Sequence, residues 1–378
     1  MNSLKAAAST LSPAVSPAAS RIMALDILRG YFIIIIASIH LSYYPSLFGV
    51  FDGRGILYMS EADGFFFISG LLIGIIRQRD LVKNGFKSAA KHLLKRGWIL
   101  YVASVILTFL YYGVALFTDK SGLSGAKDGL ADSSLWQVVQ HTLTFRYSYG
   151  WTDFLVYYAA FMGIGPLVIW LLSKGKWWLV LLISYGLYFL HWKNIAPTAF
   201  FQWQAPFFIG AVVGYHWDTI IERYRSMSVT RKALIRRTSI ASTILIYIFG
   251  ILFVLIPSLF PNAPSFLRAV YSNNLHNAYL LDLRSGLLRP FVLVIIMMGL
   301  LFIVRKYEEL ILRTIGKFIL PFGQNSLYVY IIESIVLFAV PYFILQGNFF
   351  RNSLVELGII FLVWLALRHR FLFKIIPR

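Results

Sequence analysis

The chain has 378 residues, of which 58% are hydrophobic and only 13% are charged, and its mean hydropathy is +0.71. This composition excludes an ordinary soluble domain, because such a domain could not bury so much apolar surface. The net charge of +19 would suit a nucleic-acid-binding protein, but the cytoplasmic loops of membrane proteins are also rich in lysine and arginine. The lack of cysteine excludes disulfides, cysteine–zinc sites and thiol catalysis.

Residues 1–20 are rich in alanine, serine and proline and lack the apolar core of a signal peptide, so we expect a disordered tail there. Residues 21–378 are then expected to form a single membrane domain. Long apolar runs separated by charged pieces predict an all-α bundle of about ten transmembrane helices. The expected spans are 24–45, 57–76, 97–117, 152–172, 177–191, 200–216, 238–257, 287–304, 320–345 and 353–367. A re-entrant piece between the fifth and sixth spans would change this count by about one.

Lysine and arginine are unevenly distributed among the loops. Alternate loops, beginning with the N-terminal one, hold 25 of the 35 Lys and Arg residues. This asymmetry predicts that both termini are cytoplasmic. The basic segment RQRDLVKNGFKSAAKHLLKR, 77–96, is expected on the inner membrane surface, where it would contact either anionic lipid or a phosphate-bearing ligand. The aromatic outer segments at 118–150 and 258–286 suit either a membrane interface or sugar stacking.

The first span carries polar groups that lipid disfavours. Arg29 and His40 are eleven residues apart, close to three helical turns, so they share one face and are separated by roughly 16 Å. Asp26 and Tyr44 lie near the same face. Charged groups at membrane depth usually mark function. The structural alternatives are that Arg29 snorkels to the interface or pairs with Asp26, and that His40 makes an interhelical hydrogen bond.

The depths of these two residues point to a reaction. His40 is expected in the outer half of the membrane, where an imidazole can act as general base near neutral pH. Arg29 is expected near the cytoplasmic face, where it can hold an anionic or carbonyl-bearing ligand. This arrangement favours acyl transfer from a cytosolic thioester to an outer hydroxyl group.

The second span begins with the acidic pair Glu61 and Asp63 at the expected level of His40. These carboxylates either complement the helix dipole, or one of them orients His40 or binds a sugar hydroxyl. Gly70 and Gly74 form a small-xxx-small pair that predicts close helix packing.

Further polar residues interrupt the later spans. In LPFGQNSLYVYIIES, Pro321 and Gly323 are expected to break the chain, and Asn325 or Ser326 to cap the helix that follows. Glu333 then lies inside the span and needs a partner, for which the arginine and histidine of the first span are candidates.

Two other motifs offer residues for acceptor binding. GWTDFL places Trp151 and Asp153 at an outer helix start, and FFQWQAPFFIG contains Gln202, Trp203 and Gln204. Helix capping and helix packing are the competing roles. The other histidines show no metal-ligand spacing, and neither a Walker A loop nor a dinucleotide fingerprint is present.

Together these motifs resemble a known family. MALDILRGYFIIIIASIH carries the Arg-x10-His pattern of the transmembrane acyltransferase superfamily, which includes the acyltransferase-3 and heparan-glucosaminide acetyltransferase families. The motifs that resemble the OpgC branch, across most of the chain, are SEADGFFFISGLLIG, LLKRGWILYVA, WTDFLVYYAAFMGIGPLVIWLL, FFQWQAPFFIG and LPFGQNSLYVY.

The resemblance implies a multi-pass enzyme of the bacterial inner membrane that uses acyl-CoA, with a succinyl or acetyl group, as co-substrate. It implies no tightly bound cofactor or metal and no nucleic-acid partner, but a glycan acceptor outside the cytoplasm and membrane lipids around the protein. His40 and Arg29 match the family pair, with Asp26 assisting at the donor. OpgC-like chains often carry Asp before the histidine, whereas this chain has Ile39.

The charge partner of His40 is therefore expected among Glu61, Asp63 and Glu333. We expect Glu333 to bind the acceptor together with six residues of the motifs above. These are Trp151, Asp153, Gln202, Trp203, Gln204 and Asn325. Two other functions fit the same residues: a transporter or flippase for a glycan, in which intramembrane charges bind substrate, and a non-catalytic scaffold. The sequence leaves the oligomeric state open.

Overall fold

The computed structural model describes residues 22–51, 59–116, 134–193, 195, 199–256, 262, 264–269 and 286–376. The described part is helical, and the expected N-terminal tail lies outside it. The helices are α1 Met23–Leu41, α2 Leu47–Phe51, α3 Glu61–Asn84, α4 Phe86–Leu116, α5 Leu135–Leu143, η3 Gly150–Thr152, α6 Asp153–Ser173, α7 Trp177–Trp192, α8 Ala199–Tyr215, α9 Trp217–Ser226, α10 Val229–Gly250, η4 Ile251–Leu255, α12 Ser265–Ala269, α13 Arg289–Thr314, α14 Gly316–Gln324, α15 Ser326–Phe343 and α16 Phe349–Arg368.

Within the described residues, seven helical stretches are long and apolar enough to cross a membrane, and they coincide with seven of the predicted spans. They are α1, α4, η3 with α6, α10 with the start of η4, α13, α15 and α16. The other three predicted spans also form helices. Of these, α3 has charged residues at both ends, and α7 and α8 have only 16 and 17 residues. Ten spans and cytoplasmic termini therefore stay predictions.

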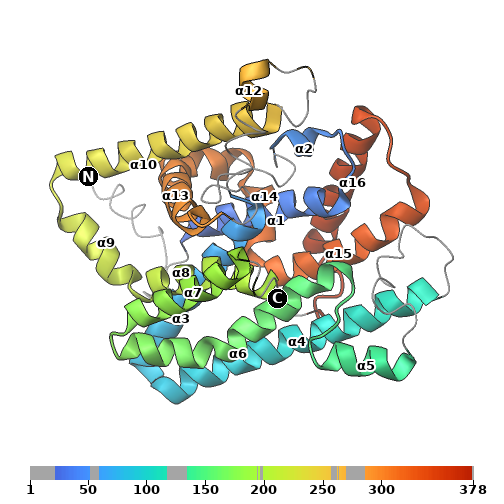
Figure 1. Ribbon diagram of the computed structural model, residues 1–378, viewed down its shortest axis with the longest axis horizontal. Coiled ribbons are helices and arrows are strands. Elements are labelled where there is room, and N and C mark those ends of the chain that lie inside the picture. Colours follow the sequence, from blue (N-terminus) through green and yellow to red (C-terminus); the bar gives the residue numbers. More distant parts are fainter. Residues whose placement is uncertain are drawn as a thin grey trace, which may run out of the picture.

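Helix α1 lies at the centre of the molecule, where it contacts α3, α13, α14, α15 and α16 (Figure 1). Most of its side chains are buried, including the isoleucines that fill its middle. A helix that is apolar on all sides is stable only when other helices or lipid surround it. The position of α1 explains why its few polar side chains meet residues from several other helices.

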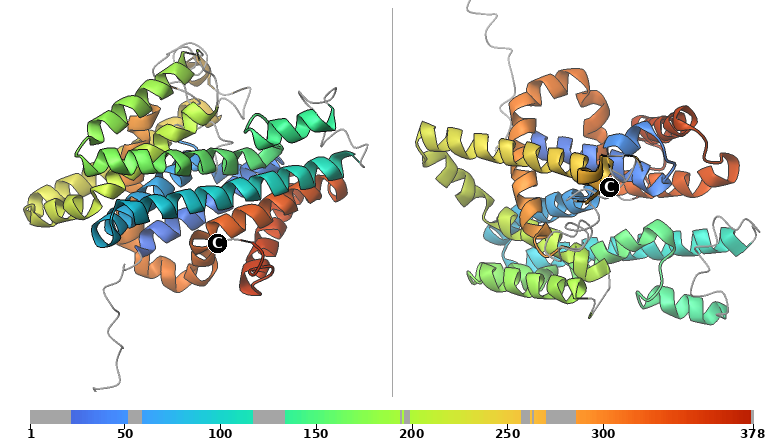
Figure 2. Two further views of the ribbon diagram at one scale, coloured as in Figure 1. Left: turned by 90° about the horizontal axis from the view of Figure 1, so that it is seen from below. Right: turned by 45° about the horizontal axis from the view of Figure 1, so that its top comes forward.

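Glycines allow two helix pairs to cross closely. Between α3 and α8, a Cβ atom on Gly70 would lie 1.9 Å from the carbonyl oxygen of Phe207, and one on Gly74 would lie 2.3 Å from that of Ala211. These contacts confirm that the glycine pair of the second predicted span serves close packing. Helices α4 and α6 form the other pair and run side by side along one edge (Figures 1 and 2), with Gly97 at their contact.

The chain break expected at Pro321 and Gly323 occurs two residues later. Helix α14 continues to Gln324, and the break is at Asn325, whose backbone N–H still bonds to the carbonyl oxygen of Pro321. The side-chain amide of Asn325 donates to the same oxygen at 3.0 Å, so it does not cap α15 as expected. Proline is tolerated inside α14 because neighbouring groups can satisfy the backbone atoms that it leaves unpaired.

Candidate functional site

Arg29 is positioned by a close crossing between α1 and α14. A Cβ atom on Gly323 would lie 1.9 Å from the backbone oxygen of Asp26, so only glycine permits this approach. Helix α15 follows directly, and its first residue, Ser326, accepts a hydrogen bond from the Arg29 guanidinium. The guanidinium carbon also lies 5.8 Å from the ring centre of Phe65 on α3. The charge of Arg29 is thus held between three helices.

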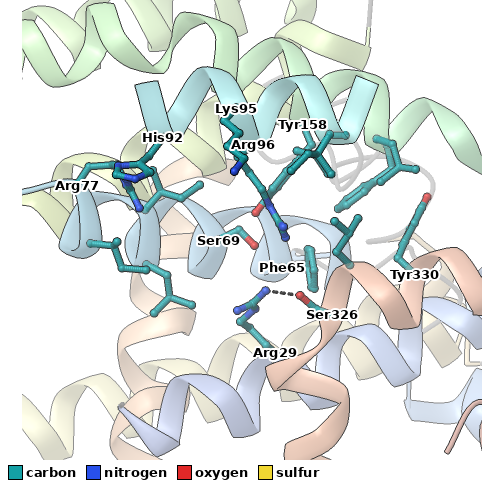
Figure 3. A pocket seen from close by; sticks show the side chains of 18 residues that line it. Arg29, Phe65, Ser69, Arg77, His92, Lys95, Arg96, Tyr158, Ser326 and Tyr330 are labelled. Atoms are coloured by element: carbon teal, nitrogen blue, oxygen red, sulfur yellow. Dashed lines mark hydrogen bonds between the residues drawn. The ribbon is translucent and has the colours of Figure 1, made fainter. Parts of the chain in front are cut away.

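A cavity of about 390 Å³ opens above Arg29 (Figure 3). Helices α1, α3, α4, α6 and α15 supply its walls. Its cationic lining consists of Arg29, Arg77, Lys95 and Arg96, with His92 beside them. Among the described residues that line the cavity there is no carboxylate. A partly enclosed space with several positive charges and no acid favours an anionic ligand.

Two arginines face this cavity from different helices. Arg96 on α4 lies within electrostatic range of both Arg29 and the phenol of Tyr158. Figure 3 shows the Arg96 side chain directed from above toward Arg29, with Tyr158 and Ser69 nearby. Like charges at close range repel, and an anion bound between them would relieve this repulsion. An anion is therefore favoured between Arg29 and Arg96.

The basic end of the cavity is held by Asp80, which lies behind its wall. The Asp80 carboxylate is 2.9 Å from both Arg77 Nη1 and His92 Nδ1. Burial raises the pKa of this carboxyl, but hydrogen bonds from Asn84, His92 and Ser88 and the charge of Arg77 outweigh burial, so the pKa lies below its ordinary value. Asp80 thus stays ionised and orients two groups that line the cavity.

The opposite end of the cavity contacts His40 through Tyr330. The Tyr330 and His40 rings form a T-shaped contact, with ring centres 6.2 Å apart and planes at 83°. The His40 ring also stacks on Trp151, with ring centres 4.3 Å apart and planes at 9°. The Tyr330 hydroxyl donates to the backbone carbonyl of Trp151, which links both aromatic partners of His40. Arg29 therefore lines the cavity, and His40, on the same face of α1, contacts Tyr330, which lines the cavity at its other end.

Two carboxyl groups lie near this aromatic end. Asp153, at the start of α6, and Glu333, one turn after Tyr330, are both within electrostatic range of the Tyr330 hydroxyl. Glu333 is only 2% exposed, and one of its carboxyl oxygens has no hydrogen-bond partner among the described residues. Glu333 is thus the predicted charge partner of His40 that shares a neighbour, Tyr330, with it.

Asp63, another predicted partner of His40, pairs with a different residue. Asp63 accepts hydrogen bonds from Arg289, including one from Nε at 2.9 Å, and forms a capping box with Ser60. The start of α3 is also set against the middle of α1, since a Cβ on Gly64 would touch the Phe32 ring. We expected Asp63 at the level of His40, and this expectation is corrected, whereas the role of Glu61 stays a prediction. Local spacing could not reveal Arg289, which is 226 residues away from Asp63 in the chain.

The remaining predicted site residues lie outside the cavity lining. Asp26 is buried where α1 crosses α14. Gln204 bonds to Ser184 at 2.8 Å and so ties α8 to α7, while Trp203 stacks on Phe66. The described contacts of these residues are packing contacts. Gln202, on the same helix, is half-buried and is not part of the lining.

Sequence reasoning did not assign to the site several residues that the structure brings together, and it named Ser326 only as a candidate helix cap. Ser326 and Tyr330 are four residues apart in LPFGQNSLYVY, so their common helical face was available as a signal. A second cluster joins α1 to α16, where Glu356 accepts hydrogen bonds from Ser38 at 2.6 Å and Ser46 at 2.7 Å. These contacts fix the chain just before and after His40. Glu356 lies about 310 residues farther along the chain, beyond the reach of any local pattern.

A family profile described as OpgC protein matches residues 21–374, which is nearly the whole chain. The chain belongs to the OpgC family. Membership in this family implies a membrane enzyme of the acyltransferase type. No curated protein matches this OpgC-family chain, and no solved structure does.

Proposed function

We propose that this chain is an acyl-CoA-dependent O-acyltransferase of the bacterial inner membrane. It moves a succinyl or acetyl group from cytosolic acyl-CoA to a hydroxyl of a glycan outside the cytoplasm. One observation carries the proposal: a single cavity has several cations at one end and, at the other, Tyr330 in contact with His40. An anionic donor and a general base can meet across such a cavity.

The length of α1 supports a specific role for Arg29. Eleven residues of helix separate Arg29 from His40 by roughly 16 Å. An extended phosphopantetheine arm has about 13 bonds between its thioester sulfur and its first phosphorus, which at ~1.25 Å per bond also reaches roughly 16 Å. With the thioester at His40, the diphosphate therefore comes to Arg29 and Arg96. Arg77 and Lys95, at the expected cytoplasmic end of the cavity, remain for the nucleotide end of the donor.

His40 removes the proton from the acceptor hydroxyl while the hydroxyl oxygen attacks the thioester carbon. The new C–O bond forms as the C–S bond breaks, and the imidazolium returns the proton to the departing CoA thiolate. Stacking on Trp151 holds the ring still, which reduces the entropic cost of the step. Trp151 is 37% exposed beside His40, so its exposed part can pack against a sugar ring.

The test uses purified protein in nanodiscs with labelled acetyl-CoA or succinyl-CoA and a glucan acceptor, and it measures free CoA. Wild type is compared with His40→Ala and with His369→Ala, a control at an exposed position after α16. We expect acceptor-dependent release, reduced by about 100-fold or more in His40→Ala and unchanged in the control. Full activity of His40→Ala would contradict the role of His40 as general base.

The same experiment separates the enzyme from the transport alternative. Release with only one donor would also identify the acyl group. If folded protein releases CoA from neither donor but carries labelled glucan into vesicles, the chain is a transporter or flippase instead. In that case Arg29 and His40 bind the glycan without chemical change.

A further inference from the structure

An open groove of about 1060 Å³ runs along the surface between α4 and α6, and it shares only Lys95 with the proposed catalytic cavity. Its floor is made of small residues, Gly97, Ala159 and Gly163. Its walls include the aromatic rings of Trp98, Tyr101 and Phe145, and the indole of Trp98 is 64% exposed. Both helices are apolar and long enough to cross the membrane, so the groove faces lipid.

One end of the groove is strongly basic. Lys87, Lys91 and Lys95 follow one another at four-residue spacing on α4, so they form a row on a single helical face. All three are exposed, and none forms an ion pair within the part of the chain that the structure describes. The row therefore offers its full charge to a ligand at the membrane surface.

The groove has the dimensions of one lipid leaflet. From Lys87 to Tyr101, α4 rises about 21 Å over its length, at 1.5 Å per residue. Half of a bilayer core is about 15 Å thick, and the headgroup region adds a few ångströms more. Lysines at one end and aromatic rings farther along match the order of headgroup, interface and hydrocarbon.

We propose that this groove binds one anionic glycerophospholipid. Its phosphate groups lie on the lysine row, and an acyl chain lies along the floor formed by Gly97, Ala159 and Gly163. Charge complementarity decides the occupant, because the groove is apolar along its length and cationic at only one end. A soluble phosphate would leave the apolar floor uncovered.

Lys95 can couple lipid binding to the donor site, because it lines both the groove and the catalytic cavity. A headgroup that draws Lys95 outward removes one cation from the cavity and weakens donor binding. This consequence rests on the proposed acyltransferase function, whereas lipid binding does not. Binding is therefore tested without any acyl donor.

Gly163 permits a clean steric test. A Cβ atom built on Gly163 meets nothing within 4 Å, so a side chain at this position extends into the groove, and leucine also favours a helix over glycine. Gly186→Leu on α7 is the matched control, because it is equally open. Lys87→Gln with Lys91→Gln removes charge outside the catalytic cavity, and Lys174→Gln with Lys176→Gln is its control.

Native mass spectrometry measures binding of phosphatidylglycerol and phosphatidylcholine to the purified proteins. We expect wild type to prefer phosphatidylglycerol by about tenfold, and the Lys87 and Lys91 double variant to lose this preference. Gly163→Leu should weaken binding of both lipids, while both controls bind as wild type does. Equal binding of the two lipids by wild type, unchanged binding by Gly163→Leu, or full displacement by inorganic phosphate would each overturn the proposal.

Discussion

Arg29 and Tyr330 connect helices that are far apart in the chain. Arg29 bonds to Ser326, which lies 297 residues away, and Tyr330 bonds to the carbonyl of Trp151, which lies 179 residues away. Each side chain does two things, since it lines the cavity and also fixes a neighbour. Substitutions at these positions can therefore separate donor binding from the geometry of His40.

Arg29→Lys is expected to raise KM for acyl-CoA by about 10-fold or more, because a charge-assisted hydrogen bond contributes ~1.5–3 kcal/mol. The decisive comparison uses acyl-pantetheine, which lacks the diphosphate. If Arg29 pairs with the diphosphate, wild type and Arg29→Lys should use this truncated donor equally well. An equal loss with both donors would instead place Arg29 at the thioester. Free thiol released by each enzyme is the measured quantity.

Tyr330→Phe removes the hydrogen bond to Trp151 but keeps the ring beside His40. We expect kcat to fall about fivefold, the effect of ~1 kcal/mol, with KM for the donor unchanged. Tyr330→Leu also removes the aromatic contact and should cost more. The pH profile of kcat is the second readout, because looser packing around His40 exposes it to water. Identical profiles for wild type and both variants would show that Tyr330 does not position His40.

Helix crossings set the distances on which the site depends. Where α1 meets α14, two backbones touch at Gly323, and this contact carries Ser326 to Arg29. The α4 and α6 pair similarly brings Arg96 and Tyr158 to one cavity. Small residues permit such approaches because they place little or no side chain between the backbones. Close packing must supply the stability, since lipid offers no hydrophobic force to drive helices together.

Gly323→Ala tests the first of these crossings. The added Cβ atom would lie 1.9 Å from the Asp26 carbonyl oxygen, so the helices must separate. We expect a loss of ~1–3 kcal/mol of stability, typical of overpacking, and a large loss of acyl transfer. Gly358→Ala on α16 is the control, since a Cβ atom there meets nothing within 4 Å. The melting temperature and the rate of CoA release are measured together; equal values for the two variants would contradict the crossing.

The whole molecule brings its candidate site residues together at one cavity. Helices α1 and α15 supply one part of the lining, and α3, α4 and α6 supply the rest. A cavity between several membrane helices can receive a donor from one side of the membrane and an acceptor from the other.

The orientation of this molecule in the membrane can be tested directly, because the chain contains no cysteine. Ser226→Cys, at the end of α9, and Gln346→Cys, between α15 and α16, introduce single exposed thiols. We expect a membrane-impermeant maleimide to label Gln346→Cys in intact spheroplasts, and Ser226→Cys only after permeabilisation. The reverse labelling pattern would invert the topology and move the basic end of the cavity to the outside.

The sequence by itself determined the membrane class, the helical fold, most of the spans and the shared face of Arg29 and His40. These features depend on local periodicity and composition, which a helix expresses directly. Only the tertiary structure decided that Asp63 pairs with Arg289, that Tyr330 touches His40, and that Arg96 faces Arg29 across one cavity. These contacts join residues far apart in the chain, and they depend on how whole helices cross, which no local pattern specifies.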